Sequence, residues 1–163
     1  MDEKLDILNE LMPLAVLKPL TPEALAAVPQ SQRLGDMVLI RRFPFRIGRE
    51  SRVRLVDGRI ERIERPKRDD REPNNDLYLL DQGQLLNISR EHLQIEDGGN
   101  GCYTLVDRGS SCGTKIADRA IGGSDAGGKE TLHDGEVIGI GAKGTPFLFK
   151  FVALAGYQLV KKD

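Results

Sequence analysis

Four polar side chains in three short stretches of the chain could together bind one phosphate group. Arg49 follows a glycine, Ser89 and Arg90 are adjacent further along the chain, and Ser111 lies in a Gly-Ser-Ser-Cys-Gly-Thr run. An arginine offers several N–H donors in one plane, and each serine adds a hydroxyl. The sequence therefore predicts an oxyanion site, provided that the fold brings these stretches together.

A phosphorylated side chain of another protein is a ligand that matches this set of donors. At pH 7 the phosphorylated side chain carries about −1.5 to −2 charges and three acceptor oxygens. Arg49 supplies a permanent cation whose planar fork can hold two oxygens at once, which a lysine cannot do. Ser89 and Ser111 are short, so the backbone beside them can approach the phosphate, and Arg90 adds a second cation or a backbone donor.

Composition excludes several other classes of protein. The chain has 163 residues, 39% hydrophobic and 30% charged, which fits one domain with an appendage. Its formal net charge of −1 gives no overall attraction to nucleic acid or to an anionic membrane. Cys102 and Cys112 are too few for a disulfide framework. We expect a cytoplasmic protein that binds no nucleic acid, inserts in no membrane, and holds no metal or cofactor.

The amino-terminal residues 1–36 are expected to form a helical extension. Apolar residues recur at helical spacing over residues 2–12, which predicts a helix. Such an apolar face more often packs on its own domain, and self-association or tethering of a partner are the alternatives. Thr21-Pro22-Glu23 has the N-cap, the first-turn proline and the acidic residue of a second short helix, which should end near Val28.

The rest of the chain has the pattern of an all-β fold. From Met37 onward, apolar residues alternate with polar ones in short runs, each of the length of one half-buried strand. Turn signals such as Asp134-Gly135 separate the runs, so residues 37–152 are predicted to form an antiparallel β-sandwich, with residues 153–163 as a C-terminal tail. The alternating apolar residues include Phe45 and Ile47, Leu77 and Leu79, Leu93 and Ile95, Tyr103 and Leu105, and Phe147, Phe149 and Phe151.

A charged insertion at residues 50–73 interrupts this alternation of apolar and polar residues. Its Asp57-Gly58 pair lies between alternating residues, which predicts a projecting hairpin. Residues 65–73 mix both signs of charge and are expected to form a flexible linker. The insertion is either a tolerated surface loop or, because it follows Arg49 directly, an extension of the anion site.

Five blocks of the sequence, in order and at matching spacing, resemble the signature of a forkhead-associated (FHA) domain. The resemblance covers about residues 37–152, and five ordered blocks are more specific than any single motif. It implies an eleven-stranded β-sandwich of the SMAD/FHA-like type whose loops at one end bind phosphothreonine peptides. The blocks are Gly48-Arg49, Asn75-Asp76-Leu77, Ser89-Arg90-Glu91-His92, residues 105–114 and residues 132–141.

The resemblance also implies roles for individual residues. Residues that match Arg49, Ser89 and Ser111 contact the phosphate in this family, and the residue that matches Arg90 is often a further polar contact. The matching histidine, His92, is structural and braces the loop that carries the first serine. A Ser and a His three apart in an extended segment would lie on opposite faces, so we expect no catalytic pair.

The remaining residues of the predicted site are supporting ones, with one departure from the family pattern. Gly48, Gly113 and Thr114 are expected to support the binding loops. Family members commonly carry an asparagine, which hydrogen-bonds the peptide main chain, where this chain has Cys112. A thiol is a weak donor and acceptor, so Cys112 is expected at the peptide but with a weaker contact. The loop after Ile116 is also altered.

Three functions follow from these residues. The first is a non-catalytic phosphothreonine-binding adaptor in Ser/Thr-kinase signalling, whose partner is a phosphothreonine-containing protein, either such a kinase or its substrate. The second is a phosphate-independent interaction scaffold on the same fold, which the substitution at Cys112 would favour. The third is an enzyme that uses Ser89 or Cys112, and it is disfavoured because no base and no metal-ligand spacing accompanies either residue.

Overall fold

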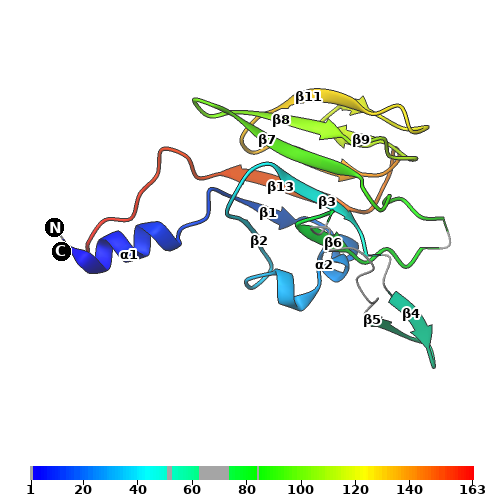
Figure 1. Ribbon diagram of the computed structural model, residues 1–163, viewed down its shortest axis with the longest axis horizontal. Helices are drawn as coiled ribbons and strands as arrows, with labels where there is room; N and C mark the ends of the chain where they lie inside the picture. The colour runs from blue at the N-terminus through cyan, green and yellow to red at the C-terminus, as the bar shows by residue number, and fades with distance from the viewer. Residues whose placement is uncertain (1, 51–52, 63–73, 84) are drawn as a thin grey trace.

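The computed structural model describes residues 2–50, 53–62, 74–83 and 85–163. In these ranges a six-stranded and a five-stranded sheet stack on each other (Figure 1). The six-stranded sheet has the order β10 (Arg119–Ile121), β9 (Thr114–Ile116), β12 (Val137–Ile140), β13 (Leu148–Ala153), β1 (Ala15–Pro19) and β2 (Val38–Ile40). The five-stranded sheet has the order β11 (Gly128–Leu132), β8 (Cys102–Asp107), β7 (Leu93–Gly99), β3 (Phe45–Arg49) and β6 (Leu77–Leu79). The predicted all-β sandwich is confirmed.

One strand pair departs from the predicted antiparallel arrangement. β3 and β6 are parallel, with Ile47 opposite Leu77. A parallel pair needs a long connection, because the chain must return to the same end of the sheet before the second strand begins. The charged insertion lies within that connection, so it is the insertion that gives the chain the length for this pairing.

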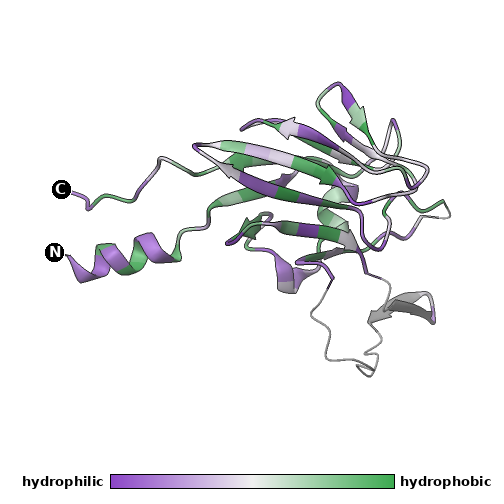
Figure 2. Cartoon of the chain, turned by 45° about the horizontal axis from the view of Figure 1, so that its top comes forward, coloured by the Kyte–Doolittle hydropathy of each residue, from purple (hydrophilic) through white to green (hydrophobic). Residues whose placement is uncertain are grey.

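The core lies between the two sheets and follows the alternation of the sequence. Phe45 and Ile47 of β3 are buried, as are Phe149 and Phe151 of β13 on the facing sheet. The ring of Tyr103 packs edge-on against Phe151, with centroids 5.0 Å apart. Figure 2 shows hydrophobic and hydrophilic bands alternating along the strands, as expected when one face of each sheet is buried.

The amino-terminal region is not the purely helical extension that we expected. The predicted helices are present as α1 (Glu3–Leu11) and α2 (Pro22–Ala27), and Thr21 caps α2 by accepting from the Ala24 N–H at 3.1 Å. Between them, β1 pairs with both β13 and β2 and is therefore an internal strand of the six-stranded sheet. The apolar run that precedes Pro19 is too short for a helix but long enough to cross a sheet. A short 3-10 helix, Gln30–Gln32, follows α2.

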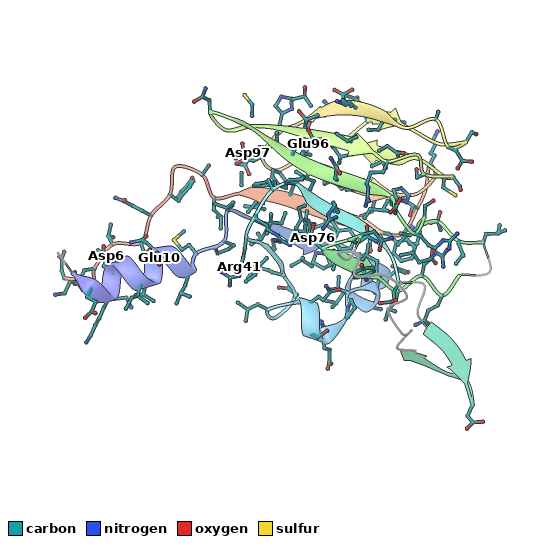
Figure 3. The ribbon with its side chains drawn as sticks, in the orientation of Figure 1. Asp6, Glu10, Arg41, Asp76, Glu96 and Asp97 are labelled. Atoms are coloured by element: carbon teal, nitrogen blue, oxygen red, sulfur yellow. The ribbon has the colours of Figure 1, made fainter. Side chains whose placement is uncertain are left out.

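Helix α1 does not pack its apolar face on the domain, contrary to the prediction. None of its residues is buried, and Figure 1 shows it extending away from the sheets with the C-terminal segment beside it. Asn9 Oδ1 accepts from the Leu159 N–H at 2.8 Å, and the Arg41 guanidinium donates to the Leu11 carbonyl at 2.8 Å. Figure 3 shows Arg41 between the sheets and this projecting helix.

The predicted hairpin is present as β4 (Val53–Val56) and β5 (Arg59–Arg62), which form a separate two-stranded sheet. Both turn residues have positive φ, 49° at Asp57 and 77° at Gly58, as the tight turn of an Asp-Gly hairpin requires. The predicted linker at 65–73 lies outside the described residues. In the ranges that are described, no helix has the length and apolar character needed to cross a membrane.

Candidate functional site

Loops at one end of the sandwich enclose a polar groove of about 530 Å³. Arg49 ends β3, Ser89 and Arg90 precede β7, and Ser111 lies between β8 and β9. All four predicted phosphate-binding residues thus line one groove, although they are far apart in the sequence. The full lining consists of Arg49, Asn74, Ser89, Arg90, Glu91, Arg108, Gly109, Ser111 and Asp125.

Arg49 is held in the groove by the loop that carries Ser89. Its backbone N–H donates to the Ser89 carbonyl at 2.9 Å, and its Nε donates to the Ile88 carbonyl at 2.9 Å. No carboxylate of the described residues forms an ion pair with Arg49, so its two terminal nitrogens keep their donors for a ligand. A guanidinium fixed through Nε presents the paired donors that suit a phosphate.

The two predicted serines meet across the groove. The Ser111 backbone N–H donates to Ser89 Oγ at 3.0 Å, so this hydroxyl accepts from the protein and retains its own hydrogen for a ligand. The Ser111 hydroxyl donates to Asp125 Oδ1 at 3.4 Å. Arg90 is exposed and is one of the residues that line the groove.

His92 connects the two loops from beneath. The ring is completely buried; its Nδ1 accepts from the Ser89 N–H at 3.0 Å, and its Nε2–H donates to the Gly113 carbonyl at 2.8 Å. Burial lowers the pKa of His92, which keeps the ring neutral, as this pair of bonds requires. The assumption that this segment is extended is wrong, because it bends before β7 begins and the His92 ring reaches the Ser89 backbone N–H. The Ser89 hydroxyl instead accepts from the Ser111 N–H.

Asp107 organises the second loop, and the sequence prediction did not include it. Its buried carboxylate accepts from the N–H groups of Gly109 at 3.0 Å and Ser110 at 2.8 Å. It also accepts from the hydroxyls of Ser110 at 2.6 Å and Thr114 at 2.7 Å. An Asp two residues before a Gly-Ser pair is a signal for such a turn. Thr114, predicted as support, acts on the loop through this carboxylate.

Gly48 allows β3 to approach the Ser89–His92 segment closely. A Cβ at this position would lie 2.0 Å from the Arg90 carbonyl oxygen, so only glycine fits. Asn75 Nδ2 donates to the same oxygen at 2.7 Å, and Arg108 Nη1 donates to Asn75 Oδ1 at 2.8 Å. Gly113 has φ of 88°, a left-handed conformation that also favours glycine.

Arg108 is a third cation of the groove that the sequence prediction missed. Its Nη2 lies 3.6 Å from Glu91 Oε1, and burial lowers the pKa of this guanidinium while Glu91 opposes the shift. The Asp-Arg-Gly-Ser run could have indicated Arg108 as a groove residue, because it places an arginine directly before the binding loop.

Cys112 is the one predicted binding residue that does not line the groove. Its Sγ donates to the Leu86 carbonyl at 3.4 Å and therefore faces the loop that leads to Ser89 rather than the groove. The Cys112 thiol thus connects two loops and does not contribute to the polar groove.

Comparison with known proteins identifies the fold family. Residues 68–141 match the family model of the FHA domain. The chain carries an FHA domain. FHA domains are non-catalytic modules that bind phosphopeptides. Ser89, Arg90 and Ser111 lie inside the matched range of the FHA model, and Arg49 precedes it.

A solved structure supports the fold over a larger part of the chain. The FHA domain of the CT664 protein from Chlamydia trachomatis superposes with a TM-score of 0.50 at 20% sequence identity. The match covers 86% of this chain and 98% of the chlamydial one. At this identity the likeness shows a shared FHA fold. No curated protein sequence matches the chain.

Proposed function

We propose that the groove binds a phosphothreonine side chain and that the protein is a non-catalytic adaptor in Ser/Thr-kinase signalling. One observation carries the proposal: the Arg49 guanidinium and the Ser89 and Ser111 side chains line the same groove, and Arg49 has no carboxylate partner among the described residues. The partner is a phosphothreonine-containing protein, either a Ser/Thr kinase or its substrate.

The surroundings of the two serines support a binding function rather than catalysis. A nucleophilic serine needs a base that can take its proton. Both ring nitrogens of His92 are engaged with backbone groups, and its bond on this side is to the Ser89 N–H rather than to the hydroxyl. The groove therefore offers donors for an anion but no histidine base for Ser89.

Titration of a phosphothreonine peptide into wild type and Arg49→Ala tests the proposal. Loss of hydrogen bonds between Arg49 and a charged ligand should cost about 1.5–3 kcal/mol, which weakens binding by about 10- to 150-fold. Binding should also weaken as salt is added. Arg42→Ala is the matched control, because Arg42 is 79% exposed and does not line the groove.

The unphosphorylated and phosphoserine forms of the peptide complete this test. The unphosphorylated form should bind far more weakly, and equal binding of the two would refute the proposal. Phosphoserine lacks one methyl group, so burial of that methyl should make phosphothreonine about fourfold tighter, from about 0.8 kcal/mol per carbon.

A phosphate-independent scaffold is the second candidate, and two observations favour it. Cys112 is turned toward Leu86, so the usual main-chain contact is absent from the groove, and the Asp125 carboxylate lies among the proposed phosphate ligands. In that case Arg49→Ala would leave partner binding unchanged, whereas the leading proposal requires its loss.

A further inference from the structure

Asp125 places a carboxylate on the wall of the proposed phosphate groove. It lies in the loop between β10 and β11 and has φ of 61°. Its backbone N–H donates to the Ser110 carbonyl at 3.1 Å, and the Ser124 N–H donates to the Ser111 carbonyl at 2.9 Å. These two bonds tie the loop to the Ser110–Ser111 segment, so the carboxylate is held beside Ser111.

The two acidic residues of the groove differ in how their charge is compensated. Glu91 lies 3.6 Å from the Arg108 guanidinium and is therefore neutralised within the protein. Asp125 accepts a hydrogen bond from the neutral Ser111 hydroxyl at 3.4 Å, and it forms no ion pair with any residue that the structure describes. The groove arginines can bind the phosphate, but none of them forms an ion pair with Asp125, so this carboxylate would stay uncompensated beside the bound dianion unless the ligand brings a cation.

We infer that the groove selects phosphothreonine peptides that carry a lysine or arginine within three residues of the phosphothreonine, and that Asp125 binds this cationic side chain. The inference rests on the proposed function. The peptide cation would neutralise Asp125, and the Ser111 hydroxyl, which can rotate, would then donate to the phosphate instead. Asp125 is a specificity-determining residue in this arrangement, while Arg49 and Ser89 supply affinity for the phosphate.

Paired phosphothreonine peptides test this selectivity. Each pair differs only by lysine or glutamine at one position within three residues of the phosphothreonine, and affinities are measured for wild type, Asp125→Asn and Asp118→Asn. Asparagine keeps the shape of the side chain and tolerates the left-handed backbone. Asp118 is an exposed turn residue outside the groove and serves as the matched control.

For the pair whose lysine reaches Asp125, the lysine peptide should bind wild type about two- to fivefold more tightly than the glutamine peptide, which is the range for an exposed ion pair. Asp125→Asn should abolish this ratio, and Asp118→Asn should retain it. If wild type binds both peptides of every pair equally, or if Asp125→Asn tightens all peptides to the same extent, the inference is wrong while phosphothreonine binding stands. If no phosphothreonine peptide binds and Arg49→Ala changes nothing, the proposed function fails as well.

Discussion

The loops around the groove and the helix α1 both lie outside the two sheets, but they are held in opposite ways. The groove loops close over buried polar groups: His92 is fully buried and Asp107 is 3% exposed, and both bond to the backbone of the loops. Helix α1 has no buried residue and is attached through exposed hydrogen bonds of Asn9 and Arg41.

This difference indicates that the groove loops are the more rigid of the two regions. A buried acceptor that satisfies several donors fixes them together, because breaking any one bond leaves a buried polar group unpaired. An exposed hydrogen bond can be replaced by water at little cost. A nine-residue helix is marginal by itself in water, so α1 should open far more easily than the groove loops.

Among variants of the groove loops and of α1, removal of the Asp107 carboxylate should destabilise the protein most. Asp107→Ala leaves four donors without their acceptor: the N–H groups of Gly109 and Ser110 and the hydroxyls of Ser110 and Thr114. We expect a loss of about 3 kcal/mol in the free energy of unfolding, measured by urea denaturation.

Asp97→Ala is the control for that substitution. Asp97 is exposed and accepts one backbone N–H, from Gly99 at 2.8 Å. Its removal should cost less than about 1 kcal/mol. Equal losses for the two variants would contradict the view that the buried carboxylate holds the loop.

A change of pH should have a smaller effect, through His92. The unfolded chain takes up this proton near the ordinary pKa of 6.5, whereas burial lowers the pKa of the ring in the folded protein. The unfolded state therefore binds more protons below this value, so the stability from neutral His92 is fully present above about pH 6.5 and is lost as the pH falls toward the lower folded value. The urea midpoint should decrease between about pH 7.5 and about pH 5.5.

Substitution of each of the two histidines in turn shows which group causes this pH dependence. His92→Gln should remove most of the decrease, while His133→Gln should retain it, because His133 is exposed and lies 3.4 Å from the Glu136 carboxylate outside the groove. A decrease that persists in His92→Gln would assign it to other groups.

The smallest effect is expected in α1. Leu8 is 50% exposed, so Leu8→Ser should change the free energy of unfolding by less than about 0.5 kcal/mol. The contrasting variant is Leu79→Ala in β6, where a fully buried leucine is truncated and about 2–5 kcal/mol should be lost. A large loss in Leu8→Ser, measured by the same urea titration, would show that α1 is as firmly held as the core.

Much of this molecule could be predicted from sequence because its patterns are local. Alternation of apolar residues gave the strands of the sandwich, Asp57-Gly58 gave the hairpin, and Thr21-Pro22 gave the start of α2. The types of Arg49, Ser89 and Ser111 predicted an anion site, and the three residues line one groove. Each of these features depends on a few neighbouring residues, whose conformational preferences are strong by themselves.

Only the tertiary structure decided which distant groups meet. β1 is internal to its sheet because β2 and β13 flank it, and a short apolar run does not specify its neighbours. The same holds for Asp107 beneath its loop, for Asp125 in the groove and for Cys112 turned to Leu86. The physical reason is that burial and pairing are properties of contacts between remote segments, whereas a sequence pattern records only what each segment prefers alone.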